Sequence, residues 1–166
     1  MKASFGVVLA AALVSASVAY AQGSASDADK AFVGKVSQGG RYEVEASKVA
    51  LMKARAQDVK DLANSEVHDH ELVNKKLKMI SATEHVAIAP ALNAEFSGKL
   101  EHLRGLSGAD FDAAYLSDMA EIHDKDEKLF AQEAVNGGAA DYKDFAAETD
   151  PIVKRHIGAL HGTDSK

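Results

Sequence analysis

The spacing of the apolar residues is the feature that most constrains how this chain can fold. From Lys30 onward the sequence is rich in Ala, Leu, Lys and Glu, and its apolar residues recur three and four positions apart instead of alternating. Such spacing is typical of amphipathic helices, each with one apolar face, and it argues against strands. We therefore predict an all-α fold.

The predicted helices form two pairs separated by a long connection. We expect long helices over residues 30–56, 58–80, 110–135 and 140–160, with a minor helix over residues 92–103 inside the connection 81–109. Asp58 is the expected N-cap of the second helix, and Asp150-Pro151 predicts a kink or a fresh start within the last. Each pair is joined by so few residues that its helices must be antiparallel neighbours. The predicted architecture is a ferritin-like four-helix bundle, in which two helical hairpins are joined by a long crossover.

The first 21 residues have the pattern of a secretory signal peptide. A positive start at Met1-Lys2 precedes an apolar run from Phe5 to Val18, and Ala19-Tyr20-Ala21 provides a small-x-small cleavage site. The apolar run is too short for a comfortable membrane span, although an uncleaved N-terminal anchor is the alternative. We expect a signal peptide over 1–21, a flexible lead-in over 22–29, the helical bundle over 30–161 and a tail over 162–166. The mature protein is then periplasmic or secreted, with no membrane span.

The composition excludes several functional classes. The sequence has no Cys, so disulfides, Cys-based zinc sites, iron–sulfur clusters and Cys nucleophiles are excluded. Its 25 acidic residues outnumber its 19 basic ones, which argues against a nucleic-acid partner. The sequence contains no Ser-His-Asp arrangement, Gly-rich phosphate loop or nucleotide motif, so hydrolase and nucleotide-dependent activities are not expected.

Ionisable residues fall on the apolar face of every long predicted helix. At about 100° per residue, each helical stripe of apolar side chains contains at least one acid or histidine. These inward residues are Glu43 in the first helix, Glu66 and His70 in the second, His123 and Asp126 in the third, and His156 in the fourth. Most lie near the middle of their helices, and a bundle brings mid-helix residues into one layer. Because buried charges are costly unless they pair or coordinate a metal, this layer needs a function or a structural role.

The residue types of this layer suit a first-row transition metal. Carboxylates favour Fe or Mn, and imidazoles also suit Zn or Cu(II). Cu(I) is disfavoured because the sequence has no Cys and retains only Met52, Met79 and Met119 once the predicted signal peptide is removed. We therefore expect Fe, Mn or Zn bound by Glu43, Glu66, His70, His123, Asp126 and His156. A redox or stress-protection role would follow from the ferritin-like fold by analogy alone.

Two other interpretations of the polar layer remain open. In the first, the chain is a non-catalytic interaction or envelope-stress module whose polar layer only aligns the helices. Glu66 and His70, at i and i+4, then form an ordinary intrahelical pair. In the second, the clustered histidines make the bundle responsive to pH. The histidines on polar faces, in the crossover or at the terminus are not expected in the site: His68, His85, His102 and His161.

Short motifs in all the long predicted helices resemble one family of bacterial secreted proteins. The resemblance covers roughly residues 31–160. The first motif is Gly39-Gly40-Arg41-Tyr42-Glu43-Val44-Glu45, and the second is Val59-Lys60-Asp61-Leu62-Ala63 with Asp69-His70. The third is Leu106-Ser107-Gly108 and Phe111-Asp112-Ala113-Ala114-Tyr115 with Met119 and His123, and the fourth is Pro151 with Arg155-His156. The family is a domain of unknown function, often described as an outer-membrane or periplasmic protein. The resemblance implies a ferritin-like bundle and an exported protein, and it puts His70 and His123 in equivalent places.

The chain departs from that family pattern in its acidic residues. Glu66 stands where the family usually has a large apolar residue, often Met, and Asp150 stands where Leu usually precedes the Pro. The Glu-x-x-His spacing of di-iron ferritin-like enzymes is also missing, because the chain has Glu66-x-x-x-His70 and His123-x-x-Asp126. The resemblance therefore does not imply a ferroxidase activity.

Overall fold

The computed structural model describes residues 25–162, and these residues are almost entirely helical. The helices are α1 (Asp27–Lys53), α2 (Gln57–Thr83), α3 (Ala94–Gly105), α4 (Gly108–Asn136) and α5 (Ala140–His161). No strand occurs within the described range, which confirms the predicted all-α class. None of these helices is long and apolar enough to span a membrane. The predicted signal peptide and most of the predicted tail lie outside the described residues.

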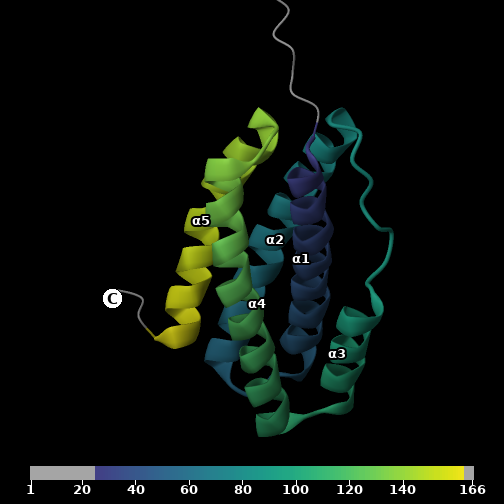
Figure 1. The fold of residues 1–166 in the computed structure, drawn as a ribbon. Helices are drawn as coiled ribbons and strands as arrows, with labels where there is room; N and C mark the ends of the chain where they lie inside the picture. Colours follow the sequence, from purple (N-terminus) through teal and green to yellow (C-terminus); the bar gives the residue numbers. More distant parts are fainter. Residues whose placement is uncertain (1–24, 163–166) are drawn as a thin grey trace, which may run out of the picture.

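The four long helices form a bundle of two hairpins, as Figure 1 shows. Helix α1 packs chiefly against α2, and α4 packs chiefly against α5. The hairpins meet through contacts of α1 with α4 and of α2 with α5. The chain between α2 and α4 runs from one end of the bundle to the other, and its short helix α3 packs on the outside of α1 (Figure 1). The predicted pair of hairpins joined by a long crossover is confirmed.

Helix α1 begins at Asp27, earlier than the predicted start at Lys30. Ser26 and Asp29 form a reciprocal cap: the Asp29 N–H donates to Ser26 Oγ at 3.2 Å, and the Ser26 N–H donates to Asp29 Oδ2 at 2.6 Å. Such a capping box satisfies two of the backbone donors that the first turn of a helix leaves without partners. The end of the predicted lead-in is therefore helical.

The predicted N-cap of α2 is wrong. Ala56, not Asp58, occupies the N-cap position and makes no side-chain cap hydrogen bond, while Asp58 Oδ1 accepts from the Val59 N–H within the first turn. At the turn itself the acceptor comes from α4, where the Asp112 carboxylate accepts from the N–H groups of Arg55 at 3.0 Å and Ala56 at 2.9 Å. A carboxylate from the other hairpin thus satisfies the amides of the α1–α2 turn.

Asp29 has the corresponding role at the α4–α5 turn. Besides capping α1, its carboxylate accepts from the N–H groups of Gly138 at 2.7 Å and Ala139 at 3.1 Å. Each hairpin turn is therefore held by an aspartate near the start of a helix in the other hairpin. These contacts join the two hairpins at opposite ends of the bundle.

Helix α5 continues through Pro151, so the predicted fresh start at this position is wrong. Proline removes one backbone N–H and thereby leaves the carbonyl group four residues earlier without its helical partner. Here both Pro151 and Ala147 are exposed, and water can solvate that carbonyl. Solvation lets the helix tolerate the residue without ending.

A polar layer divides the apolar core into two parts. One part contains Ala46, Ala63, Phe111, Tyr115 and Met119, with the residues packed around them. The other contains Phe32, Val73, Phe130, Phe145 and Val153. Along α2, α4 and α5, buried acids or histidines lie between the residues of these two parts, and in α1 the buried Glu43 follows Tyr42 at the edge of the first part. The core thus places a band of ionisable side chains in the middle of the bundle.

Candidate metal centre

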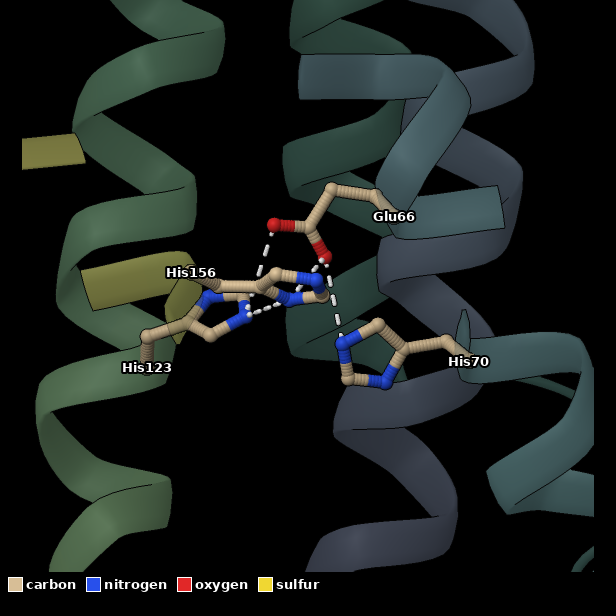
Figure 2. Close-up of side chains that lie close together, drawn as sticks. All are labelled: Glu66, His70, His123 and His156. Atoms are coloured by element: carbon tan, nitrogen blue, oxygen red, sulfur yellow. Dashed lines mark hydrogen bonds and ion pairs between the residues drawn. The ribbon is translucent and has the colours of Figure 1, made fainter. Parts of the chain in front are cut away.

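Four buried side chains from three helices converge in this polar layer. Each of Glu66, His70, His123 and His156 offers one oxygen or nitrogen atom, and these atoms all lie within 4.8 Å of one another. Helix α2 supplies the glutamate and His70, α4 supplies His123 and α5 supplies His156 (Figure 2). None of the four residues is more than 2% exposed. This group is the candidate site.

The Glu66 carboxylate faces all three imidazole rings. Its Oε2 atom lies 3.1 Å from His70 Nε2 and 3.2 Å from His156 Nδ1, and its Oε1 atom lies 3.4 Å from His123 Nε2. The two nitrogens His123 Nε2 and His156 Nδ1 are themselves 3.0 Å apart. One nitrogen of every ring is therefore directed at the same carboxylate, as Figure 2 shows.

The opposite nitrogen of each ring has an oxygen acceptor behind it. His123 Nδ1 lies 2.9 Å from the Met119 carbonyl oxygen, and His156 Nε2 lies 2.9 Å from Asp69 Oδ2. His70 Nδ1 lies 3.2 Å from Glu43 Oε2. A carbonyl or carboxylate oxygen favours a proton on the nitrogen that faces it. With the proton on the outer nitrogen, the inward nitrogen can coordinate a metal, which is how metal-binding histidines are oriented in proteins. Because His123 Nε2 and His156 Nδ1 share a hydrogen bond, one of these two carries a proton that a metal would displace.

The electrostatics concentrate negative charge on Glu66. Burial alone would raise the pKa of its carboxyl, but His156, His70 and His123 outweigh burial and hold that pKa well below its usual range. Burial raises the pKa of the Glu43 carboxyl well above its usual value, and Asp126 and Glu66 raise it further. At neutral pH Glu66 is therefore the ionised member of this pair, surrounded by imidazoles.

The histidines respond to this charge differently. Burial lowers the pKa of His123 to about 4, although Glu66 opposes the shift. For His156, burial also acts to lower the pKa, but Glu66 and Asp69 outweigh it and raise the value. The centre thus attracts positive charge, which either a proton on His156 or a metal cation can supply.

Several buried polar atoms at the centre receive no hydrogen bond from the described residues. They are both carboxylate oxygens of Glu66, both of Glu43, and His70 Nε2. The groups nearest to Glu66 Oε2 are imidazole nitrogens, at 3.1 Å in His70 and 3.2 Å in His156. A buried carboxylate without donors is costly in a protein interior. Coordination of a cation would satisfy Glu66 and His70 together.

The structure brings together four of the six residues that the sequence predicted for the site. Glu43 lies just outside this group, 3.2 Å from His70 Nδ1 and 3.6 Å from His123 Nδ1. Asp126 is 6% exposed and lines a separate pocket of about 310 Å³ between α1, α3 and α4. Burial raises the pKa of Asp126 to about 7, with a contribution from Glu66. Glu43 thus orients a histidine, and Asp126 is not in direct contact with the group.

Three groups around the site were missed at the sequence level. Asp69 follows Glu66 by three positions and so borders the same helical face, which is a signal that could have identified it. Arg155 pairs with Asp69 and stands next to His156 in the sequence. The Met119 carbonyl group left no signal, because a backbone acceptor is independent of residue type.

Fold and site together define an all-α four-helix bundle with a buried Glu/His cluster that could hold a metal ion. Residues 14–162 match the domain of unknown function DUF4142, and the chain belongs to that family.

Among solved structures, the chain is similar to the crystal structure of a DUF305 fragment from Deinococcus radiodurans. The TM-score is 0.72 at 12% sequence identity, over 84% of this chain and 96% of that one. At this identity the likeness concerns the fold alone. No curated protein matches the chain.

Proposed function

We propose that this protein binds a first-row transition metal ion through Glu66, His70, His123 and His156. One observation carries the proposal: three imidazole nitrogens and both oxygens of one carboxylate face a common point in the core. Each ring has an oxygen atom behind it, so one nitrogen of each ring already faces the common point. The ligands therefore need little rearrangement to coordinate a cation.

The donor set suits Zn²⁺, Fe²⁺ or Mn²⁺. Imidazole and carboxylate are ligands of all three metals, and four such ligands complete the tetrahedral shell that structural Zn²⁺ sites prefer. Fe²⁺ or Mn²⁺ accepts six ligands and would keep positions for a small molecule, which is the arrangement that a redox or protective role requires. The absence of Cys from the sequence disfavours Cu⁺.

The competing explanation is that the polar layer only aligns the helices. A polar network with that role is expected to have its donors and acceptors satisfied within the protein. In this bundle the Glu66 oxygens and His70 Nε2 have no hydrogen bond from the described residues. That pattern supports a ligand-binding role over a purely structural one.

Thermal unfolding of the metal-free protein, with and without added Zn²⁺, Mn²⁺ or Fe²⁺, tests the proposal. A metal that binds only the folded state stabilises it by about 2.7 kcal/mol when present at roughly a hundred times its Kd. We expect His123→Ala to abolish this stabilisation. His68→Ala, which alters an exposed histidine of α2, should leave it intact. A melting temperature that no metal changes would support the structural explanation instead.

We also propose that the protein works outside the cytoplasm, on the basis of the signal-peptide pattern in residues 1–21. Mass spectrometry of the protein from its native host tests this. A chain that begins at Gln22 is the expected product, and an intact N-terminus with cytoplasmic fractionation would contradict export.

A further inference from the structure

The candidate ligands are too deeply buried for an ion to reach them without a side chain moving. All four are at most 2% exposed. The groups behind the rings differ in this respect, because Glu43 and Met119 are fully buried, whereas the side chain of Asp69 is 14% exposed. His156, which contacts Asp69, is therefore the candidate ligand whose supporting oxygen acceptor reaches solvent.

A surface groove reaches the same place. It lies between α2 and α5, measures about 640 Å³, and includes His156 in its lining. Two other hollows, one between α1 and α2 and one between α1, α3 and α4, are lined by none of the four candidate ligands. The α2–α5 groove thus leads to a ligand, and the other hollows do not.

The charges of this groove suit a cation. Asp58, Asp61 and Ser65 line its α2 side, and Arg155 is the one Lys or Arg in its lining. Acidic side chains at an opening raise the local concentration of cations and their association rate. Two of the lining residues hold Asp69: its Oδ2 atom accepts hydrogen bonds from Ser65 Oγ at 3.2 Å and from the Arg155 guanidinium. The Arg155 side chain is 54% exposed, so it is free to leave this pair.

We propose that metal ions reach the buried centre through the α2–α5 groove and that Arg155 gates this route. Arg155 holds Asp69, and Asp69 in turn holds the His156 ring between the groove and Glu66. An incoming cation replaces the guanidinium at Asp69, and the released His156 side chain turns to admit the ion. The same movement in reverse lets the ion leave. This route rests on the proposed function, since it serves the same site.

Stopped-flow measurements with Co²⁺, a spectroscopic substitute for Zn²⁺, test the route on the full-length protein. A gate controls both directions, so Arg155→Gln should raise the association and dissociation rates by a similar factor. Loss of an exposed ion pair predicts a change of about two- to fivefold in both rates, with a nearly constant Kd. Arg155→Lys, which keeps the charge, should restore most of the wild-type rates.

Lys154→Gln is the matched control. It removes the same charge one residue earlier, where the side chain pairs with Asp150 on its own helix. Equal rates in Arg155→Gln and Lys154→Gln would overturn the gate. Slower association in Asp126→Asn, with unchanged rates in Arg155→Gln, would place the route in the α1–α3–α4 pocket and also overturn the proposal. If Co²⁺ does not bind the wild-type protein at all, the proposed function itself fails, and the route fails with it.

Discussion

Asp29 and Asp112, at the two hairpin turns, can be compared with Glu43 and Glu66, at the centre of the bundle. All four are acids buried in the same small protein. Each of the two aspartates accepts hydrogen bonds from two consecutive backbone N–H groups of a turn. The oxygens of the two glutamates receive no hydrogen bond from the described residues.

The pKa values show the consequence at one end of the bundle. Burial acts to raise the pKa of Asp29, but Glu133 and the N–H groups of Ser26, Gly138 and Ala139 lower it to about 2. Backbone donors thus make the buried charge of Asp29 stable. The Glu66 charge depends instead on three imidazoles, which can exchange protons or bind a metal. The turn acids Asp29 and Asp112 are satisfied by backbone amides, whereas the central acid Glu66 is available to bind a ligand.

The largest effect is expected from removing an acid at a turn. Asp29→Ala leaves the buried N–H group of Ala139 and the partly buried N–H group of Gly138 without their acceptor, and it also removes the capping box of α1. Unsatisfied buried donors cost 1–3 kcal/mol each, so the free energy of unfolding should fall by about 3 kcal/mol. Urea denaturation measures this loss. The metal affinity of the folded protein should not change. A large drop in that affinity would contradict the assignment of a purely structural role to the turn acids.

The second effect concerns Glu43, which contacts His70 from behind. Glu43→Leu removes the acceptor at His70 Nδ1, and loss of such a partner typically lowers metal affinity by about 10–100-fold. Glu43→Gln keeps a carbonyl oxygen beside His70 Nδ1, where Glu43 Oε2 lies at 3.2 Å, so it should retain most of the affinity. Calorimetric titration with Zn²⁺ compares the two variants. Equal losses in both would contradict this role of the Glu43 oxygen behind His70.

A third prediction reverses the sign of the first. Glu66→Met removes a buried acid and introduces an apolar side chain of similar size. The metal-free protein should therefore become more stable, by about 1 kcal/mol, because the desolvation penalty of the charge disappears. Metal affinity should fall markedly at the same time. A metal-free variant that is less stable than the wild type would contradict this. It would show that the three histidines already stabilise the Glu66 charge, as backbone amides stabilise the turn aspartates.

The smallest effect is a pH dependence near the α4–α5 turn. Burial is the main cause that raises the pKa of Glu133 from its usual value of 4.5 to about 7. A hydrogen bond with Asp29 and the negative charge of Asp29 act on this pKa in the same direction. Between these two pH values the folded protein keeps a proton that the unfolded chain has lost. The free energy of unfolding should therefore fall as the pH rises through this window.

Urea denaturation across the same pH range measures that slope. Glu133→Gln should flatten it, because the amide does not titrate. Glu95→Gln, which alters an exposed acid of α3, should leave the slope as it is in the wild type. A slope that persists in Glu133→Gln would assign the proton to another group.

The helices could be predicted from the sequence because their apolar period is a local property of the chain. Their ends were predicted less well. The N-cap of α2 was placed at Asp58, yet the amides at this turn are satisfied by Asp112, more than fifty positions away. An acceptor that comes from another helix gives no signal in the sequence around the helix end that it caps. Sequence patterns therefore located the elements but not all of their boundaries.

The site shows the same division. Helical periodicity alone identified Glu43, Glu66, His70, His123, Asp126 and His156 as inward-facing, because the angle of a residue around its helix axis depends only on its position. The tertiary structure decided that four of them share one centre, that Glu43 lies behind a ring and that Asp126 lines another pocket. Depth along the bundle and side-chain rotamers are set by how the four long helices pack, and no single helix carries that information.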